Sequence, residues 1–339
     1  GEACVSDEEA RLYRGKYLDL VENLPKRVAG WPSKPVLESD HLGPVARTNV
    51  SIKISSLSAR VDPIDTEGSI RALMAEIRPI LEAAKRNGVL VNFDMEQFAF
   101  KDFTLDLFMR CCEEVDFHAG LAMQAYLQSG EDDARRICEW SIRKGRQVTV
   151  RLVKGAYWDG EIKRAQEQGL SGYPVYTRKP NTDVSYLACA RKLFDAGAEL
   201  IYPQFATHNA HTIAAVHHIA RGRPYEYQRL HGMGTDLYAE VIGKPAPDKF
   251  GLDVPCRVYA PVGSHEDLLP YLVRRLLENR RGAFGRNEAE RLRETFQDKP
   301  WEWEKLFPWG WPKEVEEIGI AEAVMYRSDK WKKKGSYES

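Results

Sequence analysis

Short apolar runs alternate with helical segments along most of the chain, which is typical of repeated strand and helix units. In one run, Val148, Val150 and Leu152 share one parity, as a strand requires. Repetition of such units over about 230 residues matches a (β/α)8 barrel better than a doubly wound sheet. No GxGxxG follows any of the runs, which weakens the Rossmann alternative. Seven strands are expected, at residues 50–54, 89–95, 120–126, 148–154, 200–205, 225–230 and 257–262.

The intervening helices are visible as apolar stripes that end at recognisable stop signals. The clearest one buries a single face at i, i+3 and i+4 spacing, and Asn87-Gly88 ends it. A leading helix is expected over residues 7–29, another from Asn181 or Thr182 to Gly197, and a third from Asn209 to Ala220. The predicted buried face consists of Ile70, Leu73, Met74, Ile77, Ile80, Leu81 and Ala84.

Each strand run carries a polar group near its C-terminal end. Ligands bind at that end of the strands in a barrel of this kind. For any one of these residues a satisfied core polar group is the commoner explanation, but seven at one rim indicate a polar ligand. The residues are Lys53, Asp94, Gln124, Arg151, His208, His231 and Tyr259.

The densest cluster of cationic and aromatic groups follows Arg151. Residues 151–158 read RLVKGAYW, so Lys154 and Gly155 come between the strand and a helix that opens near Asp159. Two interpretations stay open from these residues alone. Arg151 either faces a ligand, or lines the barrel and pairs with an internal carboxylate while the aromatic residues pack.

A late helix carries two adjacent arginines. From Ser264 onward the pattern predicts a helix that places Tyr271, Arg274, Arg275 and Glu278 on one face and leucines on the other. The planar fork of arginine holds both oxygens of a carboxylate, so this face is a candidate anion receptor. The alternative is a solvated charged face with an i, i+4 ion pair.

Composition restricts the class of protein without identifying it. The chain has 339 residues with 49 Lys and Arg against 50 Asp and Glu, so a formal net charge of -1 gives no general attraction to nucleic acid. No run is long and apolar enough to span a bilayer. The chain does not begin with Met, which suggests an excised domain. The six cysteines form no CxxC pair and favour a reducing cytoplasm: Cys4, Cys111, Cys112, Cys138, Cys189 and Cys256.

Several long phrases resemble the proline dehydrogenase family, and within it the proline dehydrogenase domain of the bifunctional bacterial proline utilization A enzymes. The resemblance covers most of residues 1–280. Its phrases are SIKISSL (51–57), the strand with Asp94 and Glu96, MQAY (123–126), RLVKGAYWDGEIKRAQ (151–166), GYPVYTRKPNTDVSYLACA (172–190), IYPQFATHNAHT (201–212), LHGMG (230–234), YAPVG (259–263) and YLVRRLLEN (271–279).

The resemblance implies a distorted (βα)8 TIM-like barrel that binds FAD without a Rossmann fold and oxidises L-proline to Δ1-pyrroline-5-carboxylate. It implies that Arg274 and Arg275 clamp the substrate carboxylate, and that Asp94 is the partner of Lys53. The catalytic residues that it implies are Lys53, Asp94, Tyr157, Leu230, Tyr259, Tyr271, Arg274, Arg275 and Glu278.

On the cofactor side, the resemblance implies that Arg151 lies near flavin N5 and Gln124 near the pyrimidine edge. A cation near N5 stabilises the negative charge of reduced flavin. The implied cofactor-binding residues are Gln124, Arg151, Val153, Lys154, Gly155, Trp158, Lys179, Thr182, Thr207 and His208, and no metal is expected. Electrons are expected to pass to a membrane quinone, from a cytoplasmic protein with peripheral contact to the inner membrane.

The resemblance divides the chain into three parts. These are an N-terminal helix and linker (1–45), the barrel (46–282) and an unassigned C-terminal tail (283–339) that holds five tryptophans. After Glu278 the sequence departs from the family segment that supplies the last strand. The chain is also too short for the aldehyde dehydrogenase half of the bifunctional enzymes, so only the first oxidation of proline is expected.

Three other functions remain open from the residues alone. His208 and His211 suggest a metal-dependent hydrolase barrel, although no carboxylate partner lies near them in the sequence. Lys53 or Lys154 suggests an aldolase that forms a Schiff base. A barrel that binds amino acids without turnover is the third. No base for the deprotonation of the proline nitrogen is evident in the sequence.

Overall fold

The computed structural model describes residues 3–61, 65–196, 199–263, 268–269 and 286–297. Its centre is a parallel sheet of seven strands in sequential order, from β3 to β9. The strands are β3 (Thr48–Ile52), β4 (Val89–Phe93), β5 (His118–Gln124), β6 (Val148–Val153), β7 (Ile201–Ala206), β8 (Glu226–Leu230) and β9 (Cys256–Tyr259). All seven predicted strands are confirmed, with shifts of at most three residues at their ends.

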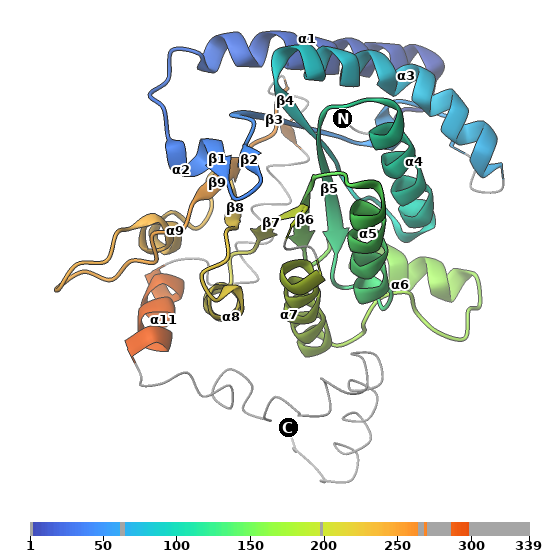
Figure 1. Ribbon diagram of the computed structural model, residues 1–339. Coiled ribbons are helices and arrows are strands. Elements are labelled where there is room, and N and C mark those ends of the chain that lie inside the picture. The colour runs from blue at the N-terminus through green and yellow to red at the C-terminus, as the bar shows by residue number, and fades with distance from the viewer. Residues whose placement is uncertain (1–2, 62–64, 197–198, 264–267, 270–285, 298–339) are drawn as a thin grey trace.

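Helices cover the outside of the curled sheet (Figure 1). They are α3 (Thr66–Asn87), α4 (Lys101–Glu114), α5 (Gly130–Lys144), α6 (Trp158–Glu167), α7 (Lys179–Ala196), α8 (Ala210–Ala220) and α9 (Thr235–Ile242). Sequential strand order excludes a doubly wound sheet, in which the order reverses at a switch point. The barrel prediction is therefore confirmed for these seven strands, and residues 270–285 lie outside the described part of the chain.

Helix boundaries follow local signals in the sequence. The carboxylate of Asp65 accepts a hydrogen bond from the Gly68 N–H at the start of α3, and Gly88 ends that helix with φ of 62°. Asn209 caps α8 in the same way, through the Thr212 N–H at 2.9 Å. Helix α7 begins at Lys179, earlier than predicted, because Pro180 is compatible with a first helical turn.

The N-terminal part contributes α1 (Asp7–Val28), which packs against α3 and β3. The linker that follows was expected to be a loop. It contains the single-turn helix α2 (Pro35–Glu38) and a short antiparallel pair, β1 (Ser39–Asp40) with β2 (Gly43–Pro44). Short 3-10 turns η1 (Ile54–Ser56) and η2 (Phe98–Phe100) follow β3 and β4. Within the described part of the tail, α11 (Arg286–Gln297) packs against α8 and α9.

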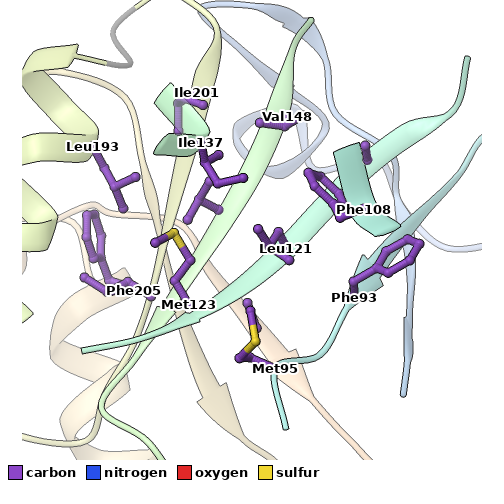
Figure 2. Close-up of a cluster of buried hydrophobic side chains, with 14 of the residues drawn as sticks. Phe93, Met95, Phe108, Leu121, Met123, Ile137, Val148, Leu193, Ile201 and Phe205 are labelled. Atoms are coloured by element: carbon purple, nitrogen blue, oxygen red, sulfur yellow. The ribbon is translucent and has the colours of Figure 1, made fainter. Parts of the chain in front are cut away.

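The main hydrophobic core lies between the strands and the helices that cover them. Figure 2 shows Phe93, Leu121 and Phe205 on strands directed towards helical side chains that include Phe108 and Leu193. All seven positions predicted for the buried face of α3 are buried. All six cysteines are free thiols, as the absence of a disulfide pattern predicted. None of the helices in the described ranges combines the length and apolarity that crossing a bilayer requires.

Replacement of Phe205 tests how much the hydrophobic core between the strands and helices contributes to stability. Phe205 is fully buried, and its ring lies within 5.3 to 6.4 Å of the rings of Phe194, Tyr225 and Tyr227. We expect Phe205→Ala to lower the free energy of unfolding by about 3 to 5 kcal/mol, because the cavity it leaves has little room to collapse. Urea denaturation measures this, with Ile142→Ala on exposed α5 as the control; equal losses in both variants would contradict the expectation.

Candidate functional site

The buried guanidinium of Arg151 lies at the centre of the strand ends. Arg151 is only 7% exposed and belongs to β6, the middle strand of the seven. Its Nε donates to Gln228 Oε1 at 2.7 Å, its Nη1 to Asp94 Oδ1 at 2.9 Å and its Nη2 to Ser51 Oγ at 3.0 Å. These partners come from β8, from the residue after β4 and from β3. The arginine that the sequence singled out is thus held from three directions.

The ring of Tyr259 completes this cluster from β9. Its centroid lies 5.0 Å from Arg151 Cζ, and its hydroxyl donates to Asp94 Oδ2 at 3.1 Å. The negative charge of Asp94 and burial together raise the pKa of Tyr259 well above its usual value, so the phenol remains a donor. Asp94 therefore accepts from Arg151 and Tyr259 at once.

Lys53 follows β3 at the same end of the sheet. Its backbone N–H donates to the hydroxyl of Tyr17 at 3.2 Å. Among the described residues its ammonium group makes no hydrogen bond or ion pair with Asp94, the partner that the resemblance implied. Asp94 instead accepts from Arg151, Tyr259 and Asn92. The next turn is fixed by Glu96, whose carboxylate accepts from the Ser55 N–H at 3.0 Å.

A second buried network lies beneath Arg151 in the barrel interior. Glu226, with no exposed surface, accepts from Gln228 Nε2 at 3.0 Å, Gln204 Nε2 at 2.9 Å and Arg257 Nε at 2.9 Å. Burial lowers the pKa of Arg257, but attraction to Glu226 outweighs it and the pKa is raised overall. Both oxygens of Glu226 accept from Arg257, and Glu226 contacts Arg151 through Gln228.

Gln124, at the end of β5, has an arrangement suited to a ligand with a hydrogen-bond donor. Its Nε2 donates to the carbonyl oxygens of Met95 and Glu96 at 3.2 and 3.1 Å. Its Oε1 is buried and has no partner among the described residues. A buried acceptor without a donor costs about 1 to 3 kcal/mol, which a donor such as flavin N3–H would offset.

The segment after β6 brings two lysines to one carboxylate. Asp183 on α7 accepts from Lys154 through one oxygen and from Lys179 through the other, at 2.5 and 2.8 Å. Burial lowers the pKa of Lys154, although Asp183 opposes that shift. Gly155 has φ of 134°, and a Cβ there would lie 2.4 Å from the ring of Tyr126, so only glycine fits.

Other residues that the resemblance assigned to the cofactor lie at the end of β6 and at the starts of α6 and α7. Val153 ends β6 and pairs in register with Gln124. Trp158 begins α6, with its Nε1 donating to the Tyr176 carbonyl at 2.8 Å, and Tyr157, which the resemblance assigned to catalysis, precedes that helix. Thr182 is buried in the first turn of α7.

On the far side, the loop after β7 carries Thr207 and His208. His208 Nε2 accepts from the Leu230 N–H at 3.3 Å. Helix α11 contacts the same place, because Glu288 Oε2 accepts from the Ala210 N–H at 2.8 Å at the start of α8. Glu288 belongs to the tail that the sequence left unassigned.

Four predicted residues fall outside the described part of the chain: Tyr271, Arg274, Arg275 and Glu278. The clamp and its orienting carboxylate therefore stay predictions. The hydrolase alternative gains no support, since in the ranges that the structure describes no three His, Cys, Asp or Glu side chains are grouped to hold a metal ion.

Sequence reasoning did not identify several side chains that hold the site together. Their signal was available in part, because Glu226, Gln228 and Leu230 share one parity on β8 and so face the interior together with Arg151. Asp183 had no comparable signal, since its link to Lys154 depends on how α7 packs. The residues missed are Ser51, Asp183, Gln204, Glu226, Gln228, Arg257 and Glu288.

The chain is similar to known proteins over most of its length. The bifunctional protein PutA of Klebsiella aerogenes is 43% identical over 287 residues, which are 82% of this chain and 21% of that protein. Proline dehydrogenase 1 of Bacillus subtilis is 28% identical over 230 residues, 66% of each chain. The chain thus spans about a fifth of the length of its bifunctional relatives.

Solved structures extend the same relationship to the fold. The crystal structure of proline utilization A from Bdellovibrio bacteriovorus, inactivated by N-propargylglycine, superposes with a TM-score of 0.73 at 33% identity, covering 90% of this chain and 31% of that one. Proline utilization A from Bradyrhizobium japonicum, mutant D779W, gives 0.70 at 40% identity, covering 82% and 27%. The family model described as proline dehydrogenase matches residues 1–285, and the chain belongs to the proline dehydrogenase family.

Proposed function

We propose that this chain oxidises L-proline to Δ1-pyrroline-5-carboxylate with FAD as its cofactor, the first step of proline catabolism to glutamate. The observation that carries the proposal is the buried Arg151, held by Asp94, Gln228 and Ser51 at the ligand-binding end of the strands. A guanidinium has five N–H donors, and three bonds use three of them. Two therefore remain for a ligand that gains negative charge.

The residues around Arg151 fit a flavin. Gln124 offers its buried Oε1 to the pyrimidine edge, and Lys154 with Lys179 supplies positive charge for the phosphates. Gly155 leaves no side chain between the backbone and the ligand. When bound, FAD supplies a two-electron acceptor for the hydride that leaves C5 of proline.

The substrate is expected between this cluster and the predicted clamp. Arg274 and Arg275 bind the carboxylate of proline, which fixes C5 at the opposite edge of so small a ring. Tyr259, Tyr271 and Leu230 wall the ring, and Lys53 lies on the same side. Release of the proton from the proline nitrogen is left to water, since no side chain in the described site is assigned to it.

The wider setting of the reaction is part of the proposal. The electrons pass to a quinone at the membrane surface, from a cytoplasmic protein with peripheral contact to the inner membrane. The relatives named bifunctional are far longer than this chain, and the proposal concerns only the proline oxidation.

The first expected outcome concerns the colour of the protein. Protein loaded with FAD should lose its yellow absorption when L-proline is added without oxygen, because proline reduces the flavin. Cyclopentanecarboxylate, which keeps the ring and the acid but has no nitrogen, should bind without bleaching. Protein that refuses added FAD, or that stays yellow with proline, would refute the proposal, and borohydride trapping of a carbonyl substrate would favour the aldolase.

A second expectation concerns the clamp. We expect Arg275→Lys to lower kcat/KM about 10- to 100-fold, since the charge stays but one charge-assisted hydrogen bond of roughly 1.5 to 3 kcal/mol is lost. Steady-state kinetics measure it, with Arg60→Lys, on an exposed side chain, as the control. Near-normal turnover in Arg275→Lys would count against the clamp.

A third expectation concerns the cofactor edge. We expect Gln124→Met to weaken FAD binding roughly 2- to 10-fold, the value of one neutral hydrogen bond. Titration of the apoprotein with FAD, followed by flavin fluorescence, gives the dissociation constant. Gln128→Met, on an exposed residue of the following loop, should leave it unchanged, and unchanged affinity in Gln124→Met would remove Gln124 from the site.

A further inference from the structure

A continuous line of hydrogen bonds joins the short helix α2 to Arg151. Arg257 Nη2 donates to the Leu37 carbonyl at 2.8 Å, and its Nε donates to both oxygens of Glu226 at 2.9 Å. Gln228 Nε2 donates to Glu226 Oε1 at 3.0 Å, and Gln228 Oε1 accepts from Arg151 Nε at 2.7 Å. Of these residues, the proposed reaction uses only Arg151 directly.

The amide of Gln228 can bond in only one orientation. If it flipped, its NH2 group would face the Arg151 N–H and its oxygen would face the carboxylate of Glu226, so that donor meets donor and acceptor meets acceptor. In these contacts Glu226 only accepts: both of its oxygens take hydrogen bonds from Arg257, and Oε1 also accepts from Gln228 and Gln204. It therefore determines which end of the amide meets Arg151.

The charges along this line alternate. Arg257 and Glu226 form one buried pair, and Arg151 and Asp94 form the second, with Gln228 between them. Each pair is neutral by itself. Glu226 is therefore not needed to balance the charge of Arg151. It affects Arg151 through the orientation of the Gln228 amide.

We propose that Glu226 is a positioning residue that fixes the guanidinium of Arg151 through the amide of Gln228. For its effect on catalysis this inference rests on the proposed flavin reaction. Arg151 then presents its remaining N–H groups in one direction, which matters because a misplaced donor stabilises a developing charge poorly.

The test removes the acceptor without changing net charge. Glu226→Met combined with Arg257→Met replaces a buried ion pair by apolar side chains, a change that proteins often tolerate. Gln228→Met removes the link itself. Glu226→Gln keeps the link, because its carbonyl oxygen can stay where Glu226 Oε1 lies, but it lowers stability, because its NH2 group then meets the Nε–H of a buried Arg257 that has lost its ion-pair partner. Tyr227→Phe is the matched control: it is the next residue on β8, fully buried, and it loses a hydrogen bond to the Ile213 carbonyl on the opposite face of the sheet.

We expect the paired variant and Gln228→Met to slow flavin reduction by proline at least tenfold, with the dissociation constant of proline within about twofold of the parent. The midpoint potential of bound FAD should shift to more negative values in both. The triple variant, which combines Glu226→Met, Gln228→Met and Arg257→Met, should reduce flavin no more slowly than the slower of these two variants, since both act through the contact between Gln228 and Arg151. Glu226→Gln should reduce flavin nearly as fast as the parent. Tyr227→Phe should lower the free energy of unfolding without slowing flavin reduction.

Arginine NMR tests the positioning without any cofactor. The Arg151 Nε–H, assigned with Arg151→Lys, should exchange slowly with water in the parent, Glu226→Gln and Tyr227→Phe, and faster in Gln228→Met and the paired variant. If the parent binds no FAD, the proposed function fails, but this measurement still decides the positioning. An unchanged exchange rate of the Arg151 Nε–H in the paired variant would overturn the inference. So would a triple variant whose loss in reduction rate is the product of the two separate losses. If the paired variant does not fold, the exchange rates of Gln228→Met and Glu226→Gln decide the question.

Discussion

The placement of one guanidinium in the middle of a curled sheet is the constraint on which the site depends. Arg151 reaches side chains of β3 and β8 and the residue after β4, and it lies under a ring from β9. These strands are far apart in the order of the sheet, so the contacts exist only if the sheet curves. The arginine and its partners therefore require the barrel, and the barrel positions them at its ligand-binding end.

Burying four charges in the same interior has an energetic consequence. Two ion pairs, Arg151 with Asp94 and Arg257 with Glu226, add little net stability, because desolvation cancels much of their attraction. Loss of one partner, however, costs about 3 to 5 kcal/mol, since it leaves a buried charge unpaired. The hydrophobic layer around Phe205 holds the strands together, while the polar interior determines the arrangement of the site.

The fold was largely predictable from the sequence, because strand parity and helix caps are local signals. Gly88 and Asn209 ended and began helices where expected, and the polar residues at the strand ends marked the site. The partners of those residues were not predictable in the same way. The resemblance paired Asp94 with Lys53, whereas the described contacts join Asp94 to Arg151 and Tyr259, and such pairing depends on side-chain reach across the barrel. Both interpretations of Arg151, ligand-facing and paired to an internal carboxylate, turn out to be compatible.

The hydroxyl of Tyr17 gives the leading helix α1 a role in the site. It accepts the Lys53 N–H at 3.2 Å and lies 3.1 Å from Ser56 Oγ, while burial raises its pKa to about 12 and keeps it protonated. The turn that carries Lys53 is thus fastened to a segment that precedes the first barrel strand. Anyone who trims this protein to a minimal catalytic fragment should retain that segment, because its removal would loosen the lysine before any barrel strand was touched.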